Sequence, residues 1–184
     1  MGSMDLGPVY LDAVLVNFQN MKKTAERAME PLSLEKLHWT PDEQSNSIAC
    51  IVKHMAGNMM SRWTDFLTTD GEKPTRNRDG EFEGGYTSRE EMMAAWEAGW
   101  EKLFEAAAAL EADDLVKTVT IRSEPHSVVQ AIERQVYHLS YHTGQIVYLA
   151  KQIRGADWET LTIPRRKSKE YLMSLENRFG KQGK

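Results

Sequence analysis

The segment that decides how this chain is organised is YHLSYHTGQ, residues 137–145, which carries two of the five histidines. His138 and His142 are four residues apart, about one turn of helix, so in a helix both imidazoles leave the same face. Helical structure is indicated by the apolar residues around the segment, which recur mostly every three or four positions: Val128, Val129, Ile132, Val136, Leu139, Ile146, Val147 and Leu149. Because the two histidines lie beside this stripe, we expect them to point inward or into a cleft. A divalent metal held by both is one way to satisfy their ring nitrogens there.

Length and composition indicate a soluble globular protein. The chain has 184 residues, of which 41% are hydrophobic and 27% charged, enough for one domain with a core. A net charge of −4 argues against nucleic acid as a partner, and no apolar run approaches the ~20 residues that span a membrane. No signal peptide is visible and Cys50 is the only cysteine, which favours the cytoplasm. Residues 1–3 resemble a cloning remnant, so we assign one domain to residues 4–184.

Four long amphipathic segments predict an all-α protein built as a four-helix bundle. They run from Pro8 to about Glu30, from a cap at Ser45–Ser47 to about Asp70, from a Ser88–Glu91 capping box to about Leu110, and from a Ser127–Gln130 capping box to about Arg154. Between the second and third helices, residues 71–86 are rich in glycine and charge, which predicts a long surface loop. Smaller elements are a turn of helix at 34–39, an isolated extended segment at 116–121 and a short helix at 168–175.

A third metal ligand must come from elsewhere in the chain. His126 lies about 18 Å along the helix axis from His138, too far to share an ion. His38 lies in a loop and stays open as a candidate, but His54, in the middle of the second helix, is the better one. Three neutral imidazoles with open coordination positions describe a catalytic type of site, suited to zinc, nickel, iron or copper. The competing interpretation treats these histidines as ordinary core or surface residues.

Cys50 precedes His54 by one helical turn and has three interpretations. It is a fourth metal ligand, a nucleophile, or a small buried core residue; its apolar helical context favours the last. The tryptophans Trp63, Trp96 and Trp100 similarly fit either a dimer interface or thick packing within one core.

Two stretches together resemble the DinB/YfiT-like superfamily: SNSIACIVKHMAGN at residues 45–58, and the pattern His138-x-x-x-His142-x-Gly144-Gln145. RWTDFL at 62–67 and DGEKP at 70–74 resemble a subgroup of largely unassigned function. The resemblance covers the chain from the first helix to about Ser168. It implies a four-helix bundle of up-down-down-up order, often dimeric, and a divalent metal, commonly nickel or zinc, held by the matching residues His54, His138 and His142.

The resemblance also implies a class of activity. Some superfamily members are thiol S-transferases that use bacillithiol, mycothiol or glutathione, and others have no known activity. Many members carry a glutamate after the first histidine of the pair, where this chain has Leu139 and Ser140. We therefore expect either a metal-dependent thiol transferase or hydrolase, or a non-catalytic dimeric bundle that binds a metal or a small molecule.

Several polar residues could serve such a site. Gln145 either orients a ligand or a histidine nitrogen, or makes a hydrogen bond inside the bundle. Arg62, Arg76 and Arg78 either bind carboxylates of a thiol cofactor or are solvated surface charges. Tyr141 and Tyr148 are expected to be packing residues rather than acids.

Overall fold

The computed structural model describes residues 5–180, and the expected cloning remnant at residues 1–3 lies outside this range. The chain divides between Ile153 and Arg154 into two compact units. The larger unit carries all the histidines, and the smaller one contains the C-terminal helix.

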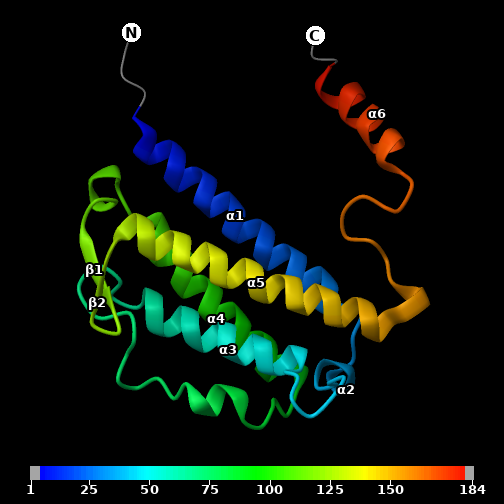
Figure 1. The fold of residues 1–184 in the computed structure, drawn as a ribbon, viewed down its shortest axis with the longest axis horizontal. Helices are drawn as coiled ribbons and strands as arrows, with labels where there is room; N and C mark the ends of the chain where they lie inside the picture. The colour runs from blue at the N-terminus through cyan, green and yellow to red at the C-terminus, as the bar shows by residue number, and fades with distance from the viewer. Residues whose placement is uncertain (1–4, 181–184) are drawn as a thin grey trace. The chain divides into compact units, whose positions relative to one another are not determined.

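The described residues are mostly helical and also contain a small two-stranded sheet, which the all-α expectation did not include (Figure 1). The elements of the larger unit are α1 (Leu6–Met29), α2 (Leu34–Leu37), α3 (Ile48–Trp63), the 3₁₀ turn η1 (Asp79–Phe82), α4 (Arg89–Ala108), η2 (Ala112–Asp114), β1 (Thr118–Ile121), β2 (Glu124–Ser127) and α5 (Val128–Arg154). The smaller unit holds η3 (Gly155–Asp157) and α6 (Ser168–Phe179), which extends beyond the short helix expected at 168–175. None of the helices in the described range is long and apolar enough to cross a membrane.

Side-chain caps explain where the long helices begin. The Asp5 carboxylate accepts a hydrogen bond from the Gly7 backbone N–H at 3.0 Å, so α1 starts two residues before the expected Pro8. Ser47 caps α3 through its hydroxyl, as predicted. Ser127 and Gln130 form the predicted reciprocal capping box before α5.

The α3 helix ends at Trp63, so the prediction that it continues to about Asp70 is wrong. Thr64 leaves the helical conformation, and Asp65 adopts a positive φ of 48°. The apolar side chain that suggested a longer helix, Phe66, is buried from within the following turn, where its ring lies 4.6 Å from that of Trp63. The spacing of Phe66 from the apolar residues of α3 thus fits a helix, although Phe66 lies beyond the helix end.

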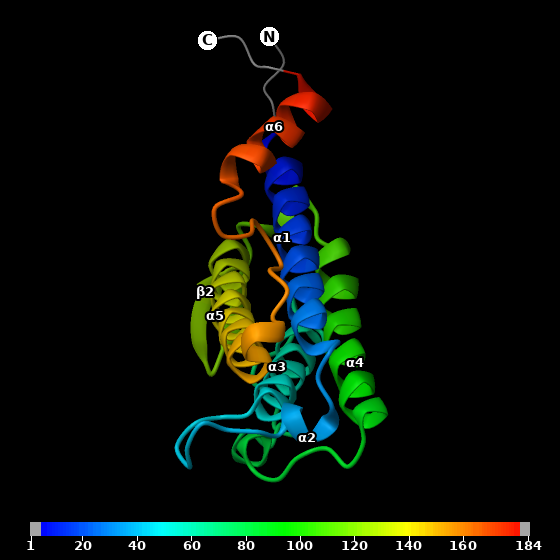
Figure 2. The same ribbon diagram turned by 90° about the vertical axis from the view of Figure 1, so that its right-hand side faces the viewer.

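The four long helices α1, α3, α4 and α5 lie side by side and enclose the core (Figures 1 and 2). The helices α3 and α4 approach each other closely, since a Cβ on Gly99 would lie 3.0 Å from the Ala56 Cα. Trp63, Trp96 and Trp100 are all buried within this core. Packing inside one unit thus accounts for the tryptophans.

The extended segment predicted at 116–121 is not isolated, because β1 pairs with β2 as an antiparallel hairpin. Its two-residue turn, Arg122-Ser123, has φ values of 57° and 64°, a conformation usually taken by Asn-Gly. The Asp70 carboxylate accepts hydrogen bonds from the backbone N–H groups of both turn residues, at 2.9 and 2.7 Å. Although burial alone raises the pKa of Asp70, these and other backbone donors lower it to about 2. An ionised carboxylate therefore fixes the turn against the segment that follows α3.

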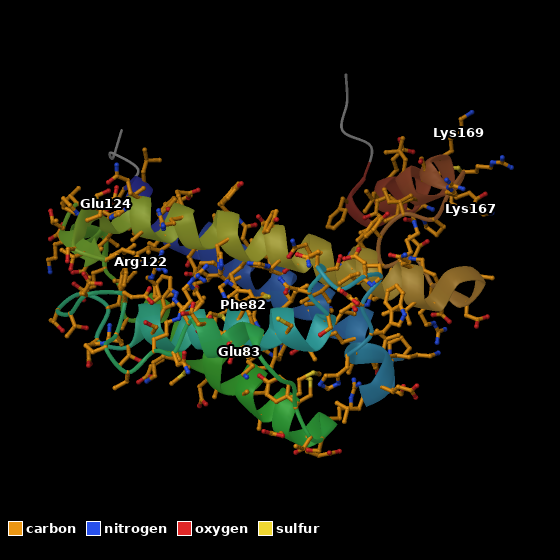
Figure 3. All side chains as sticks on the ribbon, turned by 60° about the horizontal axis from the view of Figure 1, so that its bottom comes forward. Phe82, Glu83, Arg122, Glu124, Lys167 and Lys169 are labelled. Atoms are coloured by element: carbon orange, nitrogen blue, oxygen red, sulfur yellow. The ribbon has the colours of Figure 1, made fainter. Side chains whose placement is uncertain are left out.

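Residues 71–86 are not simply a surface loop. The η1 turn packs against α3, and Figure 3 shows Phe82 and Glu83 beside that helix. Lys53 of α3 donates a hydrogen bond to the Glu83 carbonyl at 2.8 Å. Glu81 is only 6% exposed, so this segment delivers an acidic side chain to the interior.

Candidate metal centre

The structure brings together the three histidines expected to form a site. His54 extends from α3, and His138 and His142 extend from α5 one helical turn apart. One potential ligand atom from each lies within 4.8 Å of the other two. The Nε2 atoms of His54 and His138 are 3.0 Å apart. Two separate helices therefore direct three imidazoles to one point.

A buried carboxylate orients the His54 ring. The His54 Nδ1–H donates to Glu81 Oε2 at 2.9 Å, which leaves the Nε2 lone pair facing the other histidines. Glu81 in turn accepts two hydrogen bonds from Arg76, at 2.7 and 2.8 Å. Burial alone raises the pKa of Glu81, but the hydrogen bonds from His54 and Arg76 outweigh this and lower it, so the carboxylate is ionised.

The close approach of Glu81 depends on a glycine in α3. A Cβ at Gly57, three residues after His54, would lie 2.3 Å from Glu81 Oε1. Glycine in a helix interior is unfavourable by about 1 kcal/mol relative to alanine, so its presence calls for a steric reason. The space for the Glu81 carboxylate supplies that reason. Sequence reasoning missed Glu81, and this mid-helix glycine next to a candidate ligand was the available signal.

His142 is oriented by Gln145. The His142 Nδ1 lies 2.7 Å from Gln145 Oε1, and an amide oxygen only accepts, so the ring nitrogen carries the proton and Nε2 keeps its lone pair. Of the two interpretations from the sequence, this is the contact with a histidine nitrogen. Burial lowers the pKa of His142, and the hydrogen bond to Gln145 offsets part of this effect.

The surroundings of His138 disfavour its protonated form. Burial, followed by the proximity of His142 and His54, lowers its pKa to about 3, so it is neutral near pH 7. Its Nδ1 is buried and has no hydrogen-bond partner in the described part of the chain. The Nε2 atoms of His54 and His142, whose Nδ1 atoms are engaged elsewhere, and the neighbouring His138 Nε2 together fit a divalent transition metal, which binds imidazole nitrogens.

The other ligand candidates lie outside this cluster. His38 uses both ring nitrogens elsewhere, with Nδ1 2.9 Å from the Leu34 carbonyl oxygen and Nε2 accepting from the Tyr86 N–H at 3.1 Å. Within residues 5–180 the close group of metal-ligating side chains contains the three histidines and not Cys50. Cys50 is buried, which raises its pKa and agrees with the core interpretation.

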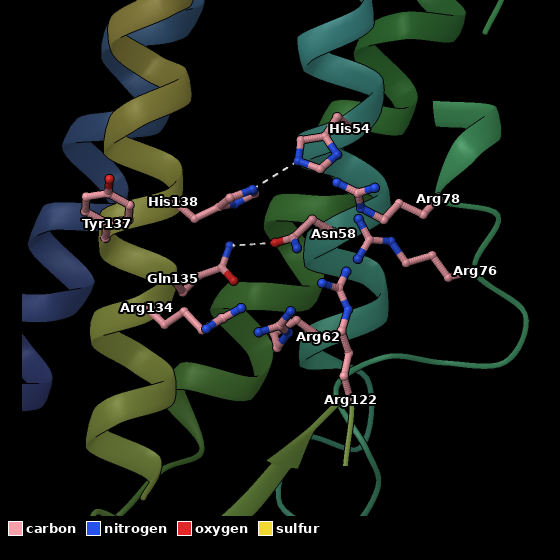
Figure 4. A pocket seen from close by; sticks show the side chains of 10 residues that line it. All are labelled: His54, Asn58, Arg62, Arg76, Arg78, Arg122, Arg134, Gln135, Tyr137 and His138. Carbon is pink, nitrogen blue, oxygen red and sulfur yellow. Dashed lines mark hydrogen bonds between the residues drawn. The ribbon is translucent and has the colours of Figure 1, made fainter. Parts of the chain in front are cut away.

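A cavity of about 330 Å³ opens beside His54 and His138, and Figure 4 shows the side chains that line it. Arg62 is among them and is 5% exposed, so the alternative of a solvated surface charge is wrong for this residue. Arg78 is exposed and lies over the Phe82 ring.

The packing role predicted for two tyrosines is also wrong. Tyr141 and Tyr148 are 55% and 71% exposed, because they lie on the outer face of α5.

Residues 5–167 match the sequence model of a family described as "Protein of unknown function (DUF1572)". No curated protein matches the chain. The family match covers well over half of the sequence, so the chain belongs to the DUF1572 family.

Proposed function

We propose that this member of the DUF1572 family is a divalent-metal-binding protein of the DinB-like type that acts as a metal-dependent thiol S-transferase. The observation that carries the proposal is the convergence of His54, His138 and His142 next to a cavity large enough for a small molecule. Three protein nitrogens leave coordination positions open for a substrate, as catalytic sites do.

The DinB-like assignment includes an up-down-down-up order of helices. The course of the ribbon in Figure 1 supports it, since α1 and α5 run in one direction and α3 and α4 in the other. The match between the histidine positions and the superfamily pattern gives independent support.

The chemistry follows from what this chain holds in place. A bound divalent ion, with nickel and zinc the first candidates, supplies a positive centre that lowers the pKa of a thiol or a water molecule. Glu81 and Gln145 fix the proton on Nδ1 of His54 and His142, so that both Nε2 lone pairs stay available without reorganisation. The cavity beside His138 gives a substrate access from one side. A metal-assisted hydrolase would use the same arrangement with water in place of the thiol.

Metal binding is tested on protein purified without an affinity tag. Elemental analysis should find about one transition-metal ion per chain, and His54→Ala and His142→Ala should each lose it. His126→Ala is the matched control, because this histidine lies in β2 outside the cluster and should leave the metal content unchanged. Equal metal content in all four proteins would refute the site.

The thiol step is tested by incubating metal-loaded protein with an electrophile and each of bacillithiol, mycothiol and glutathione. The proposal expects conjugation with at least one thiol, dependent on His142. Failure with all three would favour the second candidate, a non-catalytic bundle that binds a metal or a small molecule.

Exposure of the apolar residues Leu6, Val9 and Val16 along α1 supports a homodimer, whether or not the protein is an enzyme. Sedimentation velocity tests this, and a monomer at micromolar concentration would exclude it.

A further inference from the structure

The cavity next to the histidines is lined by an unusual number of guanidinium groups. Five arginines from four parts of the chain point toward it: Arg62 from α3, Arg76 and Arg78 from the segment before η1, Arg122 from the hairpin turn and Arg134 from α5 (Figure 4). The other described residues that line it are Gln135 and Asn58, which hydrogen-bond to each other, with Tyr137, His138 and His54, and none of them is a carboxylate.

Two carboxylates compensate only part of the positive charge. Glu72 accepts hydrogen bonds from Arg76 and Arg122, and Glu81 accepts from Arg76 and His54. No carboxylate within residues 5–180 hydrogen-bonds to Arg62 or Arg134. The cavity therefore keeps an excess of positive charge, because five guanidinium groups face two carboxylates.

Arg62 is the strongest indication that something else belongs there. It is 5% exposed, and its Nε has no hydrogen-bond partner in the described residues. Burial, and then the charges of Arg134 and Arg76, lower its pKa to about 10, which still leaves it charged near pH 7. The charge of Glu72 favours the Arg62 cation, but no carboxylate in the described residues hydrogen-bonds to it. A buried cation that is paired only in part is costly, so a ligand that supplies negative charge would stabilise this arrangement.

Arg122 reaches the cavity from a strained position. It occupies a left-handed backbone conformation that arginine rarely adopts, and it is kept there by the Asp70 carboxylate. Strain of this kind persists where the surrounding structure enforces it, and it concentrates at ligand sites. The hairpin turn thus holds a fifth guanidinium at the cavity wall.

We propose that this cavity binds the oxyanion part of a small substrate, a phosphoryl group or a pair of carboxylates, and holds the substrate beside the three histidines. Guanidinium groups bind both kinds of oxyanion through charge-assisted, often bidentate hydrogen bonds. A cavity of about 330 Å³ suits a small molecule and is far too small for a nucleic acid strand. That the substrate lies beside a bound metal rests on the function proposed above, whereas the anion site itself depends only on the arginines.

Calorimetric titration of the full chain tests the anion site. The probes are inorganic phosphate, succinate and the uncharged analogue dimethyl succinate, at one fixed ionic strength. Arg62→Met and Arg134→Met remove the two guanidiniums without carboxylate partners, and Arg134 is exposed, so its variant should fold normally. Arg165→Met, at an exposed arginine of the smaller unit, is the matched control.

The expected result is that phosphate or succinate binds and dimethyl succinate does not, with affinity reduced about tenfold or more in Arg62→Met and Arg134→Met and unchanged in Arg165→Met. Whichever anion binds more tightly identifies the substrate group. The proposal is overturned if neither anion binds better than the uncharged analogue, or if Arg134→Met and Arg165→Met behave alike.

Carrying out the titration on metal-free and on metal-loaded protein separates this inference from the proposed function. Arginine-dependent anion binding to a protein that takes up no metal would leave the anion site standing and refute the metal centre. A stoichiometric metal without arginine-dependent anion binding in either form would refute the anion site and leave the metal centre standing.

Discussion

Replacing Gly57 with alanine should damage the metal centre even though it adds only one methyl group to a helix. In an ordinary helix interior this change stabilises the protein by about 1 kcal/mol. Here the new Cβ would lie 2.3 Å from Glu81 Oε1 and 2.9 Å from its Cδ. The carboxylate must therefore move by about 1 Å to reach a normal van der Waals separation.

The displacement determines the size of the effect. The hydrogen bond from His54 Nδ1 to Glu81 is 2.9 Å long, and lengthening it by about 1 Å ends it as a hydrogen bond. Loss of such a carboxylate support for a metal-binding histidine typically weakens metal affinity about 10- to 100-fold. The charged hydrogen bonds of Glu81 are worth about 1.5–3 kcal/mol, so weakening them costs more free energy than the alanine gains in helix propensity. The free energy of unfolding should therefore fall by about 1 kcal/mol.

Gly144 offers a matched control for the same substitution. It lies in α5 two residues after His142, and a Cβ there would meet no atom within 4 Å. Gly144→Ala should raise stability by about 1 kcal/mol and leave metal affinity unchanged.

The assay is competition of each protein with a chromogenic chelator for zinc or nickel, together with urea unfolding of the metal-free form. If Gly57→Ala binds metal within about twofold of the unchanged protein and is also more stable, Glu81 has no role that requires the glycine.

Three further predictions follow from neighbouring groups. Glu81→Gln should lower metal affinity about tenfold or more, whereas Glu72→Gln, which also removes a partner of Arg76 but touches no histidine, should change it little; equal effects would contradict the role of Glu81. Because the pKa of Asp70 is lowered from 3.8 to about 2, despite burial, by backbone hydrogen bonds, its stabilising effect is complete above pH 3.8 and is lost as the pH falls toward 2. Thermal unfolding should thus show a gap between the unchanged protein and Asp70→Asn that narrows from pH 5 to pH 2, and a constant gap would contradict this. Burial raises the pKa of Cys50, so its thiol should react with a disulfide reagent much more slowly in the folded protein than in urea, and equal rates would show it to be accessible.

The sequence predicts the helical framework and the three histidines well, for physical reasons that are local. The helix starts at Ser47 and Ser127 are predictable because each serine hydroxyl caps the first turn and is followed by apolar residues at helical spacing. The pairing of His138 and His142 follows from the helical repeat alone. The addition of His54 depends on packing between α3 and α5, which the sequence indicates only through the mid-helix position of His54 and the family resemblance.

The remaining features depend on contacts between distant parts of the chain. Glu81 lies in a segment without periodicity, and its burial arises from the gap at Gly57. The hairpin turn at Arg122 lacks the usual Asn-Gly signal, because Asp70, far away in sequence, supplies the stabilising hydrogen bonds. Arg62 is buried with its side chain beside Gly71, and a contact of this kind between a helix and a later segment has no local signature.

The most direct test of the account is crystal diffraction measured on both sides of the X-ray absorption edge of the metal that co-purifies with the protein. We predict one anomalous peak per chain, at a bonding distance of about 2.0–2.1 Å from a ring nitrogen of each of His54, His138 and His142. A crystal of the metal-loaded protein with no peak among these residues, or with a peak that touches only one of them, would contradict the claim that the two helices build a metal centre.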